Sequence, residues 1–283
     1  MPKCIIVVPC YNERWRLDAA AFRALIAVQP NVDFLFVNDG STDGTGELLD
    51  TLRREPGERF RVLHLERNGG KAEAVRRGLL HAEQIGALYA GYWDADLATP
   101  LEAIPEFVAH LDAHPDVLIA FGARVRLLGC QIERRLARHY LGRIFATFVS
   151  LLFGVPVYDT QCGAKLFRMV PEVVRLFEAP FRSRWIFDVE ILARFLRDRR
   201  DLGVQAIDAV IHEIPLLRWK DVAGSKVKPR DFLKAFFELW TIRRGWLRAE
   251  PVPARPAASR PGSLRPLPGH PRTEPCLSTA HSK

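Results

Sequence analysis

Short runs of apolar and β-branched residues alternate with longer amphipathic stretches along most of the chain. Each run has the length of a buried strand, and the stretch after it is long enough for a helix that crosses back over a sheet. The runs lie at 4–8, 33–37, 60–65, 88–93 and 117–121. This alternation is typical of an α/β fold with a mostly parallel, helix-covered sheet. We therefore expect ligands at the carboxyl ends of its strands.

Amphipathic periodicity also predicts long helices, at 70–84, 131–152, 187–200 and 230–247. Two shorter helices are expected to begin near Ser41-Thr42-Asp43 and Thr99-Pro100, because hydroxyl or carboxylate caps and an early proline suit a first helical turn.

The character of the chain changes near its end. Eight of the twenty prolines lie between Pro251 and Pro275, among Ser, Arg and Ala. Such a composition buries too little apolar surface to offset the entropy of ordering. We expect one domain over 1–247, ending in a helix at 228–247, and a proline-rich disordered tail over 248–283.

The net charge of +8 favours anionic partners such as phosphates, nucleic acid or acidic membranes. The five cysteines form no CxxC pair and are odd in number, which argues against a zinc site and a disulfide framework and favours a reducing compartment. The apolar run before Pro9 is too short for a signal peptide, so we do not expect secretion.

The segment 124–157 is first basic and then apolar. Its second part, 144–157, contains Gly154 and Pro156 and is shorter than the roughly 18 apolar residues of a spanning helix. A basic stretch beside an apolar one is typical of a helix lying on a membrane surface. A buried core helix preceded by exposed arginines fits equally well. The arginines are Arg124, Arg126, Arg134, Arg135, Arg138 and Arg143.

Polar motifs follow the first three predicted strands, at 9–13, 38–45 and 68–71. In the second motif, 38–45, two carboxylates and a glycine opening onto a helix start suit a ribose and base, although a simple capped turn has the same composition. The dinucleotide fingerprint GxGxxG and the phosphate loop GxxxxGK[ST] do not occur, which weakens two common nucleotide-binding interpretations.

Asp94-Ala95-Asp96 follows the fourth predicted strand. Two carboxylates at i and i+2 repel each other unless a cation lies between them. Hard divalent cations prefer such oxygen ligands, and Mg²⁺ often bridges to substrate phosphates. A solvated loop is the alternative, but the position beside two other polar strand ends favours a metal site.

These motifs together resemble the family-2 glycosyltransferases of GT-A fold, over residues 4–245. In particular they are similar to the dolichyl-phosphate (polyprenyl-phosphate) glucosyl- and mannosyltransferase branch. The resemblance is carried by VVPCYNE, VNDGSTDGT, the Gly70-Lys71 turn and DADLATP. The later motifs DTQCGAKLF, RWIFDVE and GSK look like the β-glucosyltransferase subgroup, which favours UDP-glucose over GDP-mannose.

The resemblance implies roles for individual residues. On the donor side it implies nucleotide-binding residues, which are Pro9, Tyr11, Glu13, Asp39, Lys71 and Asp94. Asp94 and Asp96 would hold Mg²⁺ or Mn²⁺. Phosphate-binding residues would be Arg124, Arg138 and Lys226. Asp159 and Asp188 would be catalytic, with Gln161 and Glu190 on the acceptor side. Salt-bridged carboxylates and solvated basic residues are the competing explanations, and Glu73 departs from the small residue expected after the turn.

The implied reaction transfers glucose from UDP-glucose to a polyprenyl or dolichyl phosphate, with inversion. A phosphate acceptor is already anionic and needs no general base. The same resemblance implies a Rossmann-like GT-A sheet with interfacial helices, in a protein bound peripherally or monotopically to the cytoplasmic face of a membrane. Segment 124–157 would supply the contact.

Two alternatives stay open. The same fold could transfer a nucleotide-activated sugar, from GDP-mannose or UDP-GlcNAc, to a sugar hydroxyl or another lipid carrier, which would require a carboxylate base. A basic non-enzyme that binds nucleic acid or membrane would also explain the charge. We expect no nucleic-acid partner, because no aromatic stacking motif or familiar nucleic-acid fold signature accompanies the arginines.

Overall fold

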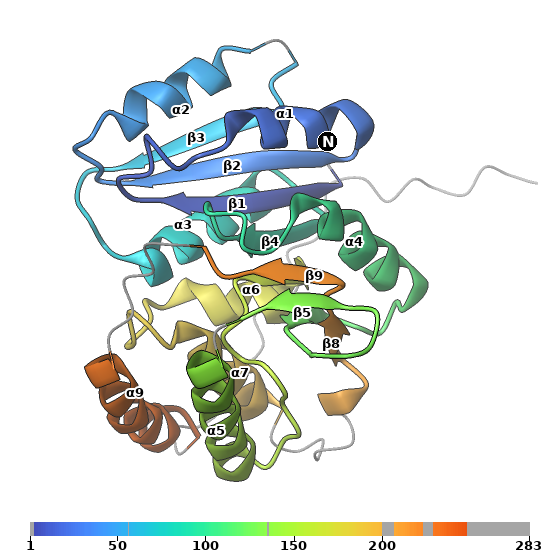
Figure 1. Cartoon of the computed structure of the whole chain (residues 1–283), viewed down its shortest axis with the longest axis vertical. Helices are drawn as coiled ribbons and strands as arrows, with labels where there is room; N and C mark the ends of the chain where they lie inside the picture. Colours follow the sequence, from blue (N-terminus) through green and yellow to red (C-terminus); the bar gives the residue numbers. More distant parts are fainter. Residues whose placement is uncertain (1–2, 56, 135, 200–206, 223–228, 248–283) are drawn as a thin grey trace, which may run out of the picture.

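A computed structural model describes residues 3–55, 57–134, 136–199, 207–222 and 229–247. The predicted tail at 248–283 and Lys226 lie outside this part. Within it, a seven-stranded sheet has the order β3-β2-β1-β4-β7-β5-β8, and β6 and β9 form a separate two-stranded sheet (Figure 1). The mostly parallel α/β fold expected from the sequence is confirmed.

The first half of the sheet is parallel throughout. Its strands are β1 (Cys4–Cys10), β2 (Val32–Asp39), β3 (Phe60–Leu65) and β4 (Tyr89–Trp93). Because all four run the same way, the polar motifs that follow them lie at one edge of the sheet. The connecting helices are α1 (Ala19–Val28), α2 (Thr45–Arg53) and α3 (Lys71–Gln84), and the 3₁₀ turn η1 (Leu101–Ala103) and α4 (Ile104–Ala113) follow β4.

The second half contains an antiparallel strand. β7 (Ala164–Arg168) lies between β4 and β5 (Ile119–Ala123) and is antiparallel to both, whereas β8 (Ile211–Pro215) is parallel to β5. Helices α6 (Pro171–Glu178) and α7 (Phe187–Asp198) follow β7.

The predicted helix from Gln131 is wrong at its start. Residues Gln131–Glu133 form β6, which pairs with β9 (Arg218–Lys220), and α5 spans only Leu136–Phe153. Ile132 is buried between two exposed neighbours, which is the period of a strand and not of a helix.

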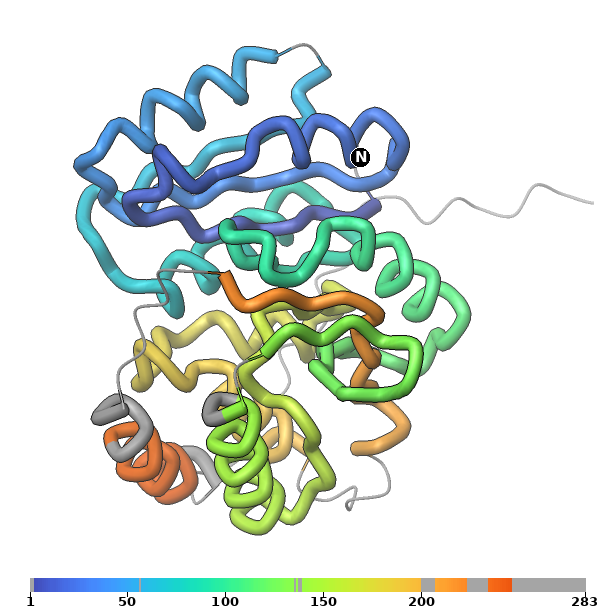
Figure 2. The backbone as a smooth tube through the Cα atoms, viewed as in Figure 1, coloured from blue at the N-terminus to red at the C-terminus, as the bar shows by residue number. Residues whose placement is uncertain are grey.

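Two apolar clusters cover the two faces of the sheet. Ile6 and Val8 of β1 face a cluster with α1, α2 and α4, while Ile5 and Val7 face the other cluster, with α3, α5, α6, α7 and α9 (Pro229–Ile242). Burial on both faces explains why β1 is a continuous apolar run. Figure 2 shows the chain path through these layers.

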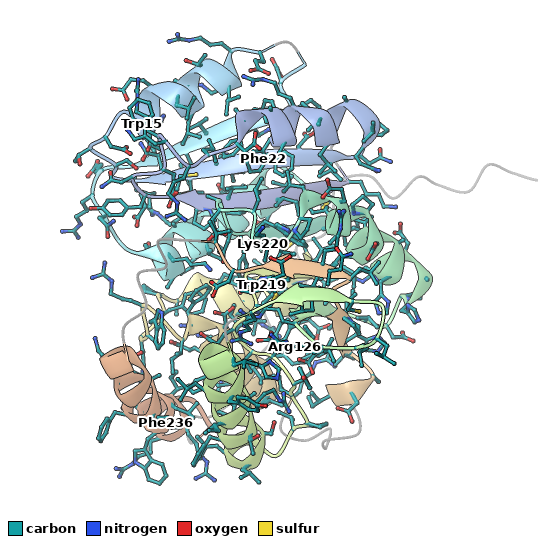
Figure 3. All side chains as sticks on the ribbon, in the orientation of Figure 1. Trp15, Phe22, Arg126, Trp219, Lys220 and Phe236 are labelled. Carbon is teal, nitrogen blue, oxygen red and sulfur yellow. The ribbon has the colours of Figure 1, made fainter. Side chains whose placement is uncertain are left out.

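Helices α5 and α9 lie next to each other at one end of the molecule, and the π-helical turn η3 (Arg243–Leu247) follows α9 (Figure 1). The Phe236 ring lies 5.8 Å from that of Phe145 and 5.0 Å from that of Phe148, between the two helices (Figure 3). None of the helices in the described ranges is both long and apolar enough to cross a bilayer.

Candidate functional site

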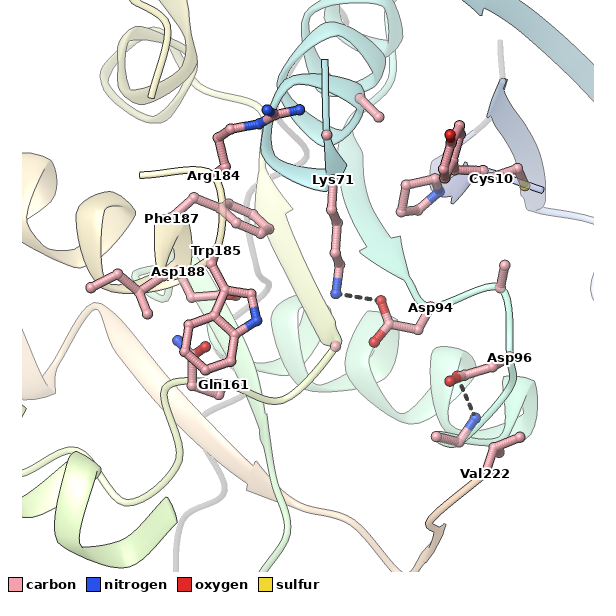
Figure 4. A pocket seen from close by; sticks show the side chains of 18 of the residues that line it. Cys10, Lys71, Asp94, Asp96, Gln161, Arg184, Trp185, Phe187, Asp188 and Val222 are labelled. Atoms are coloured by element: carbon pink, nitrogen blue, oxygen red, sulfur yellow. Dashed lines mark hydrogen bonds and ion pairs between the residues drawn. The ribbon is translucent and has the colours of Figure 1, made fainter. Parts of the chain in front are cut away.

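A pocket of about 570 Å³ opens at the edge of the sheet where the parallel strands end (Figure 4). Loops that follow β1, β2 and β4 form one wall, and the loops before β7 and α7 form the opposite wall. The pocket collects most of the predicted residues, namely Pro9, Tyr11, Glu13, Asp39, Lys71, Asp94, Asp96, Arg124, Gln161 and Asp188. Residues far apart in the sequence thus form one site.

Hydrogen bonds tie the loop after β1 to the loop after β2. The Asn12 amide donates to Ser41 Oγ over 3.1 Å, and the Glu13 amide donates to Thr45 Oγ1 over 2.9 Å. In return the Thr42 amide donates to Asn12 Oδ1. These hydrogen bonds hold the two loops together. They also fix the backbone that carries Tyr11 and Glu13, which line the pocket.

Asp39 is 2% exposed and fixes the conformation of the loop between β3 and α3. Its two carboxylate oxygens accept hydrogen bonds from the Gly69 and Gly70 amides, at 2.7 and 2.8 Å. Gly70 has φ of 88°, a conformation that favours glycine, and it directly precedes α3. Asp39 thereby positions Lys71, the first residue of α3, over the pocket.

The acidic pair after β4 lies opposite Lys71. Lys71 Nζ lies 2.5 Å from Asp94 Oδ1 (Figure 4). Arg16 Nη2 lies 3.7 Å from Asp96 Oδ2. Burial, and then the charge of Asp94, raise the pKa of Asp96. Asp94 is thus close enough to disfavour the charge on Asp96, as expected for groups that share a cation.

The acidic pair fits a hard divalent cation. Both carboxylates line the pocket and offer oxygen ligands, which Mg²⁺ and Mn²⁺ prefer. Among the residues described, no cluster of three or more His, Cys, Asp or Glu side chains has a metal-binding arrangement. A cation held by two carboxylates would complete its coordination with water and ligand phosphate oxygens, which is the usual pattern for Mg²⁺.

Asp159 pairs with Arg124 and is not part of the pocket wall. Arg124 Nε donates to Asp159 Oδ2 at 2.6 Å and Nη2 donates to Oδ1 at 2.7 Å. Although burial acts in the opposite direction, Arg124 lowers the pKa of Asp159 to about 2. The predicted catalytic carboxylate is therefore a poor proton acceptor, and it anchors an arginine that does line the pocket.

Asp188 reaches the pocket from the first turn of α7. Lys165 Nζ donates to Asp188 Oδ1 at 2.6 Å, and the Tyr92 hydroxyl donates to the same oxygen. Lys165 also donates to the carbonyl oxygens of Thr160 and Cys162, at 3.0 and 2.8 Å. This buried lysine joins the loop before β7 to α7.

Glu190 is not brought to the pocket, contrary to its predicted acceptor-side place. It is 0% exposed and lies on the inner face of α7, where Arg194 Nη2 donates to Oε1 at 2.9 Å. Its Oε2 accepts from the Arg182 and Ser183 amides. Glu190 therefore stabilises the turn before α7. The side chain of Arg138, like Lys226, lies outside the described part of the structure.

Several lining residues were not predicted. Arg184 and Trp185 belong to the RWIFDVE motif, and Arg134 belongs to the arginine-rich segment, but nothing in the sequence separated them from their neighbours. Trp219 lies on β9 and lines the pocket (Figure 3). The Trp219 ring lies 5.2 Å from the Arg124 guanidinium. Gly163 had no assigned role, yet a Cβ atom there would overlap the Asp94 carboxylate.

Comparisons with known proteins identify the family of this chain. A sequence model of glycosyl transferase family 2 matches residues 5–171. The dolichyl-phosphate beta-glucosyltransferase of Saccharomyces cerevisiae is 30% identical over 260 residues, covering 86% of this chain and 74% of the yeast protein. The polyprenol monophosphomannose synthase of Mycolicibacterium smegmatis is 26% identical over 254 residues, covering 88% and 91% of the two chains.

Solved structures agree on the fold. The crystal structure of glucosyl-3-phosphoglycerate synthase from Mycobacterium tuberculosis in complex with UDP has a TM-score of 0.60 to this chain at 18% identity, covering 86% of this chain and 80% of the other. The GT-A-like α/β architecture implied by the sequence resemblance is thereby confirmed. From the family match and the yeast relative together, the chain belongs to glycosyl transferase family 2.

Proposed function

We propose that this protein transfers glucose from UDP-glucose to a polyprenyl phosphate such as dolichyl phosphate, with a divalent cation on Asp94 and Asp96. The observation that carries the proposal is a single pocket with an acidic pair on one wall and arginines on another. Relatives named dolichyl-phosphate beta-glucosyltransferase support glucose as the sugar and dolichyl phosphate as the acceptor. The solved complex of glucosyl-3-phosphoglycerate synthase from Mycobacterium tuberculosis with Mn²⁺, UDP-glucose and phosphoglyceric acid supports a metal-assisted donor site.

On the donor side, the chain's residues would bind the nucleotide and orient its diphosphate. Tyr11, Glu13 and Asp39 line the part of the pocket suited to the nucleotide. When bound, Mg²⁺ or Mn²⁺ would neutralise charge on the leaving diphosphate. Lys71, 2.5 Å from Asp94, adds a fixed cation beside the same group.

On the acceptor side, the nucleophile would be a phosphate oxygen. Its bond to the sugar's anomeric carbon forms as the bond from that carbon to the diphosphate oxygen breaks, and UDP leaves with the bonding electron pair. A phosphate monoester carries about −1.5 to −2 charge at pH 7, so no proton has to be removed. The low pKa of Asp159 and the two donors on Asp188 favour this acceptor over a hydroxyl.

The proposed place of action is the cytoplasmic face of a membrane, with α5 and α9 in contact with lipid. Phe148, Leu151, Phe237 and Trp240 are 51%, 78%, 78% and 52% exposed on these two helices. Apolar side chains exposed together on adjacent helices suit the headgroup boundary of a bilayer. Arg126 of the same segment is exposed and would add attraction to anionic lipids.

One assay tests the proposal. The full chain is incubated with UDP-glucose, GDP-mannose or UDP-GlcNAc and with a polyprenyl phosphate or the matching polyprenol, with Mg²⁺, Mn²⁺ or a chelator. We expect glucosyl transfer to the phosphate only, and loss of turnover with the chelator. Transfer to the alcohol, or preference for another donor, would contradict the proposed substrates.

A further inference from the structure

A single serine connects α9 to the turn before α7. Ser183 is 2% exposed, and its hydroxyl donates to Glu238 Oε2 of α9 over 2.6 Å, the length of a charge-assisted hydrogen bond. The same Oγ accepts hydrogen bonds from the Trp185 and Ile186 amides, at 3.2 and 2.8 Å. Ser183 thus makes one bond to α9 and two bonds within its own turn.

The bond to Glu238 sets the direction in which the Ser183 hydroxyl acts. A hydroxyl has one hydrogen and two lone pairs. Because Glu238 accepts the hydrogen, both lone pairs of Oγ are left for the two amides, as in a helix N-cap. A hydroxyl that donates to a carboxylate is polarised and becomes a stronger acceptor. Glu238 therefore stabilises a turn that lies 55 residues before it in the chain.

A second contact joins the same two segments. Gly245 of η3 packs against Arg182, where a Cβ atom at 245 would lie 2.0 Å from Nη1. From the α7 side, Glu190 Oε2 accepts from the amides of Arg182 and Ser183, at 2.8 and 3.1 Å. The Glu190 bonds thus hold the start of the turn, and the Ser183 bonds hold its end.

The end of this turn is a wall of the pocket. Residues 184–188 all line the pocket, and Asp188 is one of them (Figure 4). Ala235 of α9 lines it as well and is 1% exposed. Glu238 follows Ala235 by three positions, so both lie on the face of α9 that is turned toward the pocket. A displacement of this wall by about 1 Å can cost on the order of 10²-fold in rate.

We propose that Glu238 is a positioning residue for the pocket wall at 184–188 and acts on it through the Ser183 hydroxyl. Among the described residues that line the pocket Glu238 does not appear, so its effect is transmitted by the turn. The inference rests on the proposed function for the acceptor used in its test, whereas the hydrogen bonds are independent of the ligand. It gives α9 a role in the site in addition to its proposed contact with lipid.

The test compares Glu238→Leu and Ser183→Ala, which each remove the bond, with Glu238→Gln, which keeps an acceptor oxygen. Lys234→Gln is the matched control, because it breaks the 3.8 Å ion pair of Glu238 with a lysine that is 75% exposed and leaves the Ser183 bond in place. The acceptor is a short, soluble isoprenyl monophosphate. Glu238→Leu and Ser183→Ala should each lower kcat/KM for this acceptor at least tenfold, with the UDP-glucose KM within threefold of wild type. Glu238→Gln should recover most of the loss, and Lys234→Gln should match wild type.

The double variant Ser183→Ala/Glu238→Leu should be no slower than the slower single variant, because both changes remove the same bond. Amide hydrogen exchange reports on the turn directly. The Trp185 and Ile186 amides should exchange at least tenfold faster in Glu238→Leu than in Glu238→Gln. Unchanged exchange in the buried strand β1 confirms folding. If Glu238→Leu does not fold, Glu238→Ala replaces it.

Equal exchange of the two amides in Glu238→Leu and Glu238→Gln would overturn the inference, as would multiplied losses in the double variant. If the wild-type chain transfers no sugar to the isoprenyl monophosphate, the proposed function fails. The exchange comparison then decides this inference alone: faster exchange in Glu238→Leu supports it, and equal exchange rejects it.

Discussion

Lys165 Nζ lies 2.6 Å from Asp188 Oδ1, and the two side chains are 0% and 7% exposed. The pair connects β7 to α7 behind the pocket. Burying two charges costs several kcal/mol per ion unless each finds polar partners. Here the lysine has three acceptors and Asp188 has the Tyr92 hydroxyl as a further donor. The pair therefore fixes the position of one pocket wall.

Removal of Lys165 alone should be strongly destabilising. In Lys165→Met, Asp188 would remain buried without its cation, which typically costs about 3–5 kcal/mol of unfolding free energy. The double variant Lys165→Met/Asp188→Asn should recover a substantial part of that loss. Urea unfolding of both variants and of Asp188→Asn gives the coupling energy. Simple additivity of the two single changes would show that the ion pair has no such role.

Gly163→Ala should impair catalysis by displacing Asp94. The Asp94 amide donates to the Gly163 carbonyl at 3.2 Å, and a Cβ atom at 163 would overlap the Asp94 carboxylate. Displacement of a reacting group by about 1 Å can cost on the order of 10²-fold in rate. Turnover and Mn²⁺ affinity should both fall. Gly46→Ala, whose nearest neighbour would be the Asn38 side chain at 3.1 Å, serves as the control with near-normal values.

Asp96→Asn should lower activity without lowering the stability of the fold at neutral pH. Loss of a metal ligand should lower kcat/KM by a factor on the order of 10³. The raised pKa of Asp96 means that the folded protein binds its proton more tightly than the unfolded chain does. Stability from this group is therefore greatest below the ordinary Asp pKa and declines as pH rises through the raised value.

Without divalent cation at neutral pH, Asp96→Asn should consequently be as stable as wild type or more stable, and the pH dependence due to Asp96 should disappear. Thermal unfolding between pH 4 and 7 measures this. Marked destabilisation at neutral pH with full activity would contradict both the metal assignment and the electrostatic argument.

Leu151→Gln/Phe237→Gln should weaken membrane binding without affecting the pocket. Both side chains are 78% exposed on α5 and α9. Burying such a side chain contributes about 1.5–3 kcal/mol, so the double change should lower the liposome partition coefficient at least tenfold. Turnover of a soluble acceptor should be preserved. Val28→Gln, 68% exposed on α1, is the matched control, and equal sedimentation of the two variants would reject this surface.

The central strands of the parallel half were predictable because β1, β2 and β4 are buried on both faces, so they appear in the sequence as largely apolar runs. β6 was missed because three residues such as Gln131–Glu133 carry too little pattern to be separated from the helix that follows. The buried ion pairs of Asp159 with Arg124 and of Glu190 with Arg194 were not predictable either. Arg124 is 35 residues from Asp159 along the chain, and no local periodicity shows which carboxylate a buried arginine will reach.

Because β7 is antiparallel to β4, the effect of an inserted residue on this site depends on which end of β7 it lies at. Trp93 at the end of β4 pairs with Ala164 at the start of β7, so the chain enters β7 at the pocket and leaves it at the opposite edge of the sheet. An inserted residue at 160–163 would shift Gln161 and Gly163 relative to Asp94. The same insertion after Arg168 would fall far from the chemistry. In related chains that use different acceptors, we therefore expect the sequence changes to lie before β7. Changes in loop length without effect on activity are expected after β7.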